Sequence, residues 1–243
     1  MSFSEHNHNG LIFDTSDVLS AVPGAVHAFT TRHGGVSPAP FDSLNFADNR
    51  GDRSENLLEN YRLLGEAVGI DASRAVGCRQ IHSDLVRVAC EEDAGKILWN
   101  DRPYDADGLI TNVPNLPLFA YGSDCCVITL YDPTSRSIGA VHAGWRGTAA
   151  GIALKAAVSM MSCYGADPYT LRAAIGPSIG KCCFETDRDV ADAFFALLDP
   201  AMDERIEQRG DKFHIDLKEI NRLWLLRAGI DPARIDVHPD CTK

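Results

Sequence analysis

The feature that most constrains the fold of this 243-residue chain is a pair of strand-like segments followed directly by a helix-like one. Residues 126–132 (CVITLYD) and 137–143 (SIGAVHA) are rich in β-branched residues, and the turn between them begins with an Asp-Pro pair. Asp and Pro both favour turns, so we predict an antiparallel hairpin. A glycine-containing turn then leads into residues 148–163, which we predict to form a helix capped by Thr148.

The rest of the chain alternates strand-like and helix-like segments, without an internal repeat or a low-complexity linker. Further strands are predicted at residues 25–31, 85–90, 116–121 and 170–176. Further helices are predicted at residues 54–69 with Ser54 as N-cap, at 187–198, and at 216–229 with Asp216 as N-cap and Gly229 at the end. These elements predict an α/β (α+β) fold, in which one domain spanning residues 1–243 has a mixed sheet flanked by helices. The polar residues 1–10 are predicted to be a flexible N-terminal tail.

The composition favours a protein that acts on small molecules. The net charge is −11, and an acidic chain attracts nucleic acid and anionic membranes poorly, so we expect neither as a partner. No apolar run approaches the roughly 20 residues of a membrane span, and the N-terminus lacks a signal-peptide pattern. We therefore expect a cytoplasmic protein. Its eight cysteines form no CxxC pair, so free thiols or metal ligands are expected rather than disulfides.

Three residues at the edges of predicted strands form a candidate metal-binding set: His82, Cys125 and His142. The hairpin can bring Cys125 and His142 to the same end, and the fold must bring His82 to them. One thiolate and two imidazoles suit zinc with its fourth position open, which is the pattern of a catalytic site. Two other interpretations stay open on spacing alone, namely buried structural histidines with a buried thiol, and a nucleophilic Cys125 activated by a histidine.

The turn that follows His142 is a candidate anion site. It runs through Gly144, Trp145, Arg146 and Gly147 into the predicted helix, whose first N–H groups favour negative charge. The guanidinium of Arg146 can bind phosphate or carboxylate in a bidentate manner. Trp145 can either stack on a flat ring or pack beside the turn.

Two long loops are further candidates for binding residues. Residues 30–47 form a Gly- and Pro-rich segment that carries Arg32 and Asn45, and residues 174–185 form the other. Loops of this length are often functional, although both can also be plain connections.

Several segments taken together resemble one known family. They are TTRHGGVSPAPFDSLNFA, QIHSD, DADGLIT, SDCCVITLYD, GAVHAGWRGTAAGI and AAIGPSIGKCCFE, and they extend from about residue 25 to the end of the chain. The chain is similar to the multicopper polyphenol oxidase or laccase-domain family, whose bacterial members are also described as peptidoglycan editing factors. The human relative is known as a purine nucleoside enzyme.

The resemblance implies a zinc site made by His82, Cys125 and His142, and it does not extend to Cys126, where the family usually has an apolar residue. It implies phosphorolysis of adenosine, inosine and methylthioadenosine to the base and a sugar 1-phosphate, together with deamination of adenosine to inosine. Within it, we assign catalytic roles to Cys125, Asp124 and Arg146. The candidate substrate-binding residues are Arg32, Asn45, Gln80 and Trp145, with Arg32 as a second phosphate-binding group.

Asp124 or Asp84 could serve as the acid or base, or could orient a ligand histidine. The expected partners are purine nucleosides and inorganic phosphate.

Other functions remain open at this level. The older family name suggests a copper-dependent phenol oxidase, but one His/His/Cys set does not supply the ligands of a multicopper cluster, so copper is the less favoured metal. A peptidoglycan-editing hydrolase acting on amide bonds could use the same three residues. A non-enzymatic metal-binding or interaction role is the simplest alternative. Phosphate dependence distinguishes phosphorolysis from deamination and amide hydrolysis.

Overall fold

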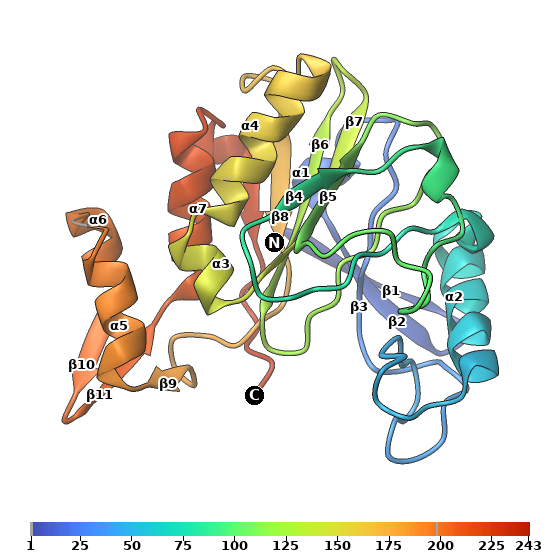
Figure 1. The fold of residues 1–243 in the computed structure, drawn as a ribbon, viewed down its shortest axis with the longest axis horizontal. Coiled ribbons are helices and arrows are strands. Elements are labelled where there is room, and N and C mark those ends of the chain that lie inside the picture. Colours follow the sequence, from blue (N-terminus) through green and yellow to red (C-terminus); the bar gives the residue numbers. More distant parts are fainter. Residues whose placement is uncertain (1, 198) are drawn as a thin grey trace.

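The computed structural model describes residues 2–197 and 199–243 and is built around a six-stranded mixed sheet (Figure 1). The strand order is β12-β8-β6-β7-β5-β4. The strands are β4 (Val86–Val88), β5 (Gly108–Thr111), β6 (Cys126–Asp132), β7 (Ser137–Ala143), β8 (Arg172–Ile175) and β12 (Ile235–Val237). The two outermost pairs, β12–β8 and β5–β4, are parallel, and the inner pairs are antiparallel. The predicted hairpin of residues 126–143 lies at the centre of this sheet.

One face of the sheet is covered by helices α4 (Ile152–Tyr164) and α7 (Leu217–Arg227), which pack side by side (Figure 1). Apolar side chains from both helices and from the sheet form the largest core cluster, in which Ile128, Leu130 and Met160 are fully buried. The short helices α3 (Trp145–Ala149), α5 (Arg188–Phe195) and α6 (Pro200–Asp203) lie around the same layer. Burial of this face supplies the main driving force for the fold.

The opposite face is covered by the N-terminal segment. Helix α1 (Asp17–Ser20) and a small sheet of β1 (Phe3–His8), β2 (Leu11–Ser16) and β3 (Phe29–Thr30) contribute buried Leu19 and Phe29, which pack with Tyr131 and Ala174 of the large sheet. Helix α2 (Ser54–Val68) packs beyond this sheet. The molecule is therefore a mixed sheet between two layers, as the predicted fold class requires.

The remaining elements are peripheral. Strands β9 (Glu185–Thr186), β10 (Ile206–Arg209) and β11 (Lys212–Ile215) form a third sheet. Three 3-10 helices are η1 (Ala72–Arg74), η2 (Glu91–Asp93) and η3 (Pro232–Arg234). Within the described part of the chain, every helix is too short or too polar to cross a lipid bilayer.

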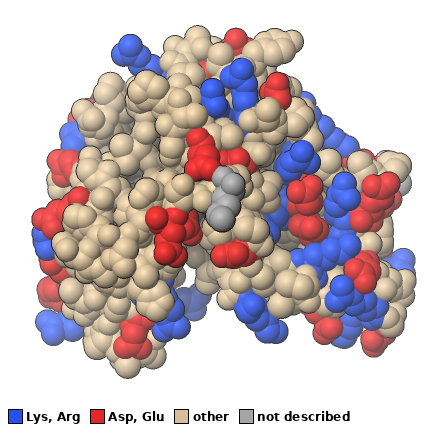
Figure 2. All heavy atoms as spheres, turned by 180° about the vertical axis from the view of Figure 1, so that it is seen from behind, with Lys and Arg blue, Asp and Glu red and all other residues tan. Residues whose placement is uncertain are grey.

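The charged side chains are mixed over the surface that Figure 2 shows. Lys and Arg alternate there with Asp and Glu between larger uncharged areas, and the chain as a whole carries a net charge of −11.

Five of the six predicted strands are confirmed: β6 and β7 have the predicted bounds, and the other three are shorter than predicted. The segments 85–90 and 170–176 contain β4 and β8, and 25–31 contains only the two residues of β3. The predicted strand at 116–121 is wrong, because this segment makes only an isolated bridge between Val76 and Leu118. Pro117 lacks the N–H that a strand ladder needs, which explains the irregular backbone.

The helix predictions differ from the structure mainly at their ends. Helix α2 begins at Ser54 but its N-cap is Arg53, and α7 has the predicted cap, with Asp216 accepting the N–H of Glu219. The predicted helix 148–163 is wrong at its start, because Gly151 at φ 76° separates the short α3 from α4. For the prediction 187–198, helix α5 ends at Phe195, and residue 198 lies outside the described residues.

The predicted N-terminal tail is ordered over most of its length, which corrects the prediction for residues 1–10. Strand β1 pairs with β2 in a register that places His8 opposite Leu11, so the loop between them has two residues. These residues are Asn9 at φ 53° and Gly10 at φ 91°, the sequence most typical of a two-residue hairpin turn. Residue 1 lies outside the described residues.

This turn gives a test of the N-terminal hairpin. A Cβ atom at Gly10 would meet nothing within 4 Å, so alanine fits in space but not in the left-handed backbone. We expect Gly10→Ala to lower the free energy of unfolding by about 1 kcal/mol. Urea titration followed by circular dichroism measures this change, and an unchanged midpoint would show that the hairpin contributes nothing to stability.

Candidate metal centre

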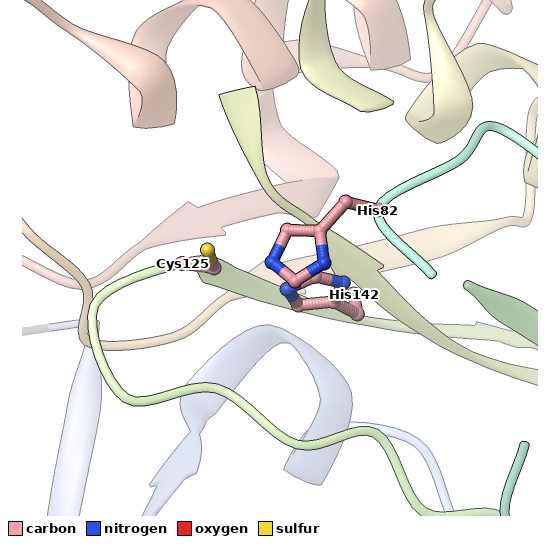
Figure 3. A group of neighbouring side chains, drawn as sticks. All are labelled: His82, Cys125 and His142. Atoms are coloured by element: carbon pink, nitrogen blue, oxygen red, sulfur yellow. The ribbon is translucent and has the colours of Figure 1, made fainter. Parts of the chain in front are cut away.

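The central hairpin brings two of the three predicted ligands together. Residue pairing places Val127 opposite His142 and Cys126 opposite Ala143, so Cys125 precedes β6 at the end of the sheet where His142 lies. The donor atoms of His82, Cys125 and His142 all lie within 4.8 Å of one another. Figure 3 shows the three side chains converging, with His82 entering from a loop. The predicted juxtaposition of these residues is confirmed.

His82 reaches the cluster through an unusual backbone. Its φ is 59°, in the left-handed region that residues other than glycine rarely adopt. The loop is held by the carboxylate of Asp107, whose Oδ1 accepts the N–H of His82 at 3.0 Å. Oδ2 accepts the N–H of Ser83 at 2.6 Å, the N–H of Ile81 at 3.3 Å and the hydroxyl of Ser83 at 2.7 Å. These bonds stabilise a conformation that would otherwise be costly.

The same carboxylate orients His142. Oδ1 of Asp107 lies 2.8 Å from Nδ1 of His142, and the carbonyl of Asp107 accepts the N–H of His142 at 2.7 Å. Because Nδ1 is engaged, Nε2 is the nitrogen that faces the cluster. Burial lowers the pKa of His142, but its hydrogen bonds to Asp107 and Cys125 outweigh burial and raise the pKa to about 9. The imidazole is therefore fixed in orientation by a carboxylate, as metal-binding histidines usually are.

The sequence analysis did not identify Asp107 as the residue that orients the candidate ligands. Asp84 and Asp124 were the predicted candidates for orienting a histidine, and for that role they are wrong. Asp84 forms an ion pair with Lys155, and Asp124 accepts the hydroxyl of Thr242 at 2.7 Å. Asp107 precedes β5, which pairs with β7, and this pairing between distant segments places it beside His142.

Two glycines of the turn after β7 allow the loop of His82 to approach. A Cβ atom at Gly144 would lie 3.1 Å from Cδ2 of His82, 3.4 Å from Sγ of Cys125 and 3.5 Å from Cε1 of His142. A Cβ atom at Gly147 would lie 2.8 Å from the carbonyl oxygen of Ser83. The glycines therefore provide the space in which the three donors meet.

The donor set fits a transition-metal ion. One sulfur and two imidazole nitrogens are borderline-soft donors, which zinc and copper accept and which calcium and magnesium do not prefer. His142 is buried, Cys125 is half-buried and His82 is exposed, so the cluster opens to solvent on the side of His82. Three protein donors with an open side leave a coordination position for water or substrate. Cys126 lies in the core against Ser178, in agreement with leaving it out of the set.

Arg146 and Trp145 lie next to this cluster on α3. The guanidinium of Arg146 lies 4.2 Å from the centre of the Trp145 ring, and the indole packs against the main core. Burial lowers the pKa of His82 and the charge of His142 lowers it further, whereas the charge of Asp107 raises it and that of Arg146 makes the smallest contribution, which lowers it. The predicted cap Thr148 is instead buried, where its hydroxyl donates to the carbonyl of Ala143.

The other predicted site residues make contacts that organise loops. Gln80 donates its amide N–H to the carbonyl of Tyr121 and accepts the Tyr121 N–H, both at 2.7 Å. Asn45 donates to Asp52, and exposed Arg32 donates to the carbonyl of Asp42. The bonds of Gln80 join the loop of His82 to the segment before Cys125, whereas those of Asn45 and Arg32 stay within residues 30–52.

Residues 26–243 match the model of the family described as multi-copper polyphenol oxidoreductase laccase. The chain belongs to this family. It is 35% identical over 223 residues to purine nucleoside phosphorylase YlmD of Geobacillus stearothermophilus, covering 90% of this chain and 81% of the relative. It is 36% identical over 210 residues to purine nucleoside phosphorylase of Deinococcus radiodurans, covering 86% and 76%.

The fold of this laccase-family chain is also that of a solved relative. The crystal structure of the hypothetical protein YfiH from Bacillus licheniformis superposes with a TM-score of 0.90 at 30% identity, covering 99% of this chain and 89% of the other. The resemblance noted from the sequence motifs is therefore confirmed, and so is the fold class.

The role of Asp107 gives a second prediction. In Asp107→Asn an NH2 group replaces one of the two carboxylate oxygens, so in either orientation it would face at least one backbone N–H group of residues 81–83 instead of accepting from it. We expect the free energy of unfolding to fall by about 1–3 kcal/mol and metal affinity to fall about 10–100-fold. Urea titration and competition with a chelator measure the two effects.

The matched control is Asp105→Asn, which makes the same chemical change in an exposed residue paired with Arg79. Exposed ion pairs contribute little, so this variant should behave like the unmodified protein. Equal stability and metal affinity in the two variants would contradict the role given to Asp107.

Gly144 gives a third prediction. Its φ of −65° suits any residue, so alanine introduces no backbone strain, and its methyl group would enter the space between the three donors. We expect Gly144→Ala to weaken metal binding about tenfold with little change in the unfolding midpoint. Isothermal titration of the metal-free protein with Zn²⁺ tests this, and unchanged affinity would show that the donors do not converge beside Gly144.

Proposed function

We propose that this chain is a metal-dependent purine nucleoside phosphorylase. The observation that carries the proposal is the cluster of His82, Cys125 and His142, held by Asp107 and open to solvent. The relatives named purine nucleoside phosphorylase add the substrate class, and they align with most of this chain. The proposed substrates are adenosine, inosine and S-methyl-5′-thioadenosine, with inorganic phosphate as the second substrate.

In the proposed reaction, a phosphate oxygen forms a bond to C1′ of the sugar while the bond from C1′ to the purine nitrogen breaks. The base leaves with the electron pair of that bond and takes up a proton, and the other product is the sugar 1-phosphate. We also propose deamination of adenosine, in which water adds at C6 of the purine and ammonia leaves. Both reactions need an oxygen nucleophile held against one carbon atom.

We assign the phosphate to Arg146, with Arg32 as the second candidate. Arg146 is exposed, carries a fixed positive charge and follows Gly144 by two residues, and a Cβ atom at Gly144 would lie 3.1 Å from Cδ2 of His82. Phosphate bound there would lie beside the cluster, where the guanidinium can donate two hydrogen bonds to it. Trp145 is half-buried beneath the guanidinium of Arg146, and we assign it, with Asn45 and Gln80, to the side of the site that binds the nucleoside.

Asp124 is the proposed acid–base group. It is exposed, directly precedes Cys125, and is positioned by a hydrogen bond from the Thr242 hydroxyl to Oδ1. We assign Oδ2 to proton transfer with the leaving base. A carboxylate next to the reacting groups is the common solution for such a transfer.

We propose zinc as the metal, because one thiolate and two imidazoles with an open side are typical of catalytic zinc sites. Zinc bound there would supply Lewis-acid chemistry. A copper-dependent oxidase is less favoured, since one set of two histidines and one cysteine does not supply the ligands of a multicopper cluster. Eight free cysteines agree with the proposed cytoplasmic location.

The decisive experiment is turnover of adenosine with and without phosphate. Purified protein, freed of contaminating phosphorylases, should release adenine and ribose 1-phosphate only when phosphate is present. Cys125→Ala removes a proposed metal ligand and should lower kcat/KM by more than the roughly 100-fold that loss of a supporting residue costs. Chromatography of adenine, inosine and ribose 1-phosphate measures each product.

The matched control is Cys163→Ala, because Cys163 is a free and exposed cysteine on α4, away from the cluster. It should leave turnover unchanged. Inosine that forms without phosphate would support the deaminase activity alone. Absence of every product from the unmodified, zinc-loaded protein would contradict the proposed function and favour a hydrolase acting on amide bonds.

A further inference from the structure

A second group of donor residues lies outside the site described above. It consists of Cys182, Cys183 and Cys241, whose sulfur atoms all lie within 4.8 Å of one another. Cys182 and Cys183 follow β8, and Cys241 follows β12. Strands β8 and β12 are parallel neighbours, and their extensions still pair where Ser178 bridges Cys241. Two segments about sixty residues apart therefore leave the same end of the sheet together.

The backbone around these cysteines is arranged for close approach of sulfur atoms. The N–H of Gly180 donates to Sγ of Cys241 at 3.2 Å. The carbonyl of the same glycine accepts the N–H groups of Cys183 and Phe184, both at 2.9 Å, which closes a tight turn. A Cβ atom at Gly180 would lie 3.2 Å from Sγ of Cys182 and 3.6 Å from Sγ of Cys241, so only glycine leaves this space free.

We propose that Cys182, Cys183 and Cys241 bind a thiophilic metal ion, of which Zn²⁺ and Cu⁺ are the biological representatives. The donor set is entirely sulfur, and soft thiolate ligands select these ions over magnesium, calcium and manganese. Cys182 is exposed and the other two are half-buried, so an ion can enter from solvent. Binding releases the thiol protons and involves no change of oxidation state.

A cation is the natural partner of three sulfurs at this spacing. Thiolates this close repel one another, and a shared positive ion converts that repulsion into attraction.

Metal binding here would fasten the segment after β12 to the turn after β8. That segment carries Thr242, whose hydroxyl donates to Asp124, and Asp124 adjoins Cys125. The proposed second ion would thus be structural, and it would act on the first site only by holding Thr242 in place. This inference is independent of the proposed enzymatic activity.

The test uses the full chain, reduced, stripped of metal and titrated with Zn²⁺ or, under anaerobic conditions, with Cu⁺. The variant His82→Ala/Cys125→Ala removes two donors of the first site, and it should still bind about one ion per chain. Adding Cys182→Ser and Cys241→Ser to that variant should abolish binding, whereas adding Cys163→Ser instead should not. Elemental analysis gives the stoichiometry, and intense near-ultraviolet absorption on Co²⁺ substitution reports thiolate ligation.

A second comparison keeps the test decisive if the variant that lacks the first site does not fold. The unmodified chain should bind two ions, and Cys182→Ser/Cys241→Ser should bind one while keeping the circular dichroism spectrum of the folded protein. The proposal would be overturned if neither comparison showed an ion whose binding depends on Cys182 and Cys241. So would an intact mass showing that two of the three cysteines form a disulfide in the freshly isolated protein.

Discussion

The candidate metal centre depends on one buried carboxylate. Asp107 fixes Nδ1 of His142 directly, and it holds His82 in place by accepting the backbone N–H groups of residues 81–83. The carboxylate side chain is completely buried, so its charge must be stabilised by these donors, and burial in turn strengthens each bond. Burial raises the pKa of Asp107, yet its hydrogen bonds with His142 and Ser83 outweigh burial and lower it, so the group is ionised at neutral pH. Two of the three ligands thus share a single anchor.

The glycines of the turn after β7 leave the space that the loop of His82 needs when it binds Asp107. The carboxylate pulls the loop of His82 inward, and the loop can follow only because Gly144 and Gly147 have no side chains in its path. Trp145 between them fills the core side, and Arg146 stays on the solvent side, stacked on the indole. The sequence of this turn is therefore explained by packing on one side and by access to the metal centre on the other.

Local sequence patterns predicted the central hairpin, but they did not predict contacts between segments that are distant in the sequence. The hairpin of residues 126–143 and the meeting of Cys125 with His142 follow from two adjacent strands and the turn between them. The position of Asp107 follows from the pairing of β5 with β7, which no short pattern indicates. The Asn9-Gly10 turn, by contrast, was a local signal that the polar composition of the first ten residues obscured. The break at Gly151 was likewise hidden by helix-forming residues on both sides.

The end of the described chain connects the two clusters of candidate metal ligands. Lys218 of α7 donates to the carbonyls of His238 and Asp240, and these bonds fix the path of the chain toward Cys241. One residue later Thr242 donates to Asp124, whose carbonyl also accepts the N–H of Ile179 from the turn that carries Cys182 and Cys183. Asp124 is thereby held from both segments that contribute sulfur to the second cluster. Asp124 directly precedes Cys125. Contacts that hold the segments after β8 and β12 together therefore also restrict the backbone that positions the thiol of Cys125. The order of the metal centre is thus set from two directions: by the buried carboxylate of Asp107 on the side of the histidines, and by the paired ends of β8 and β12 on the side of the cysteine.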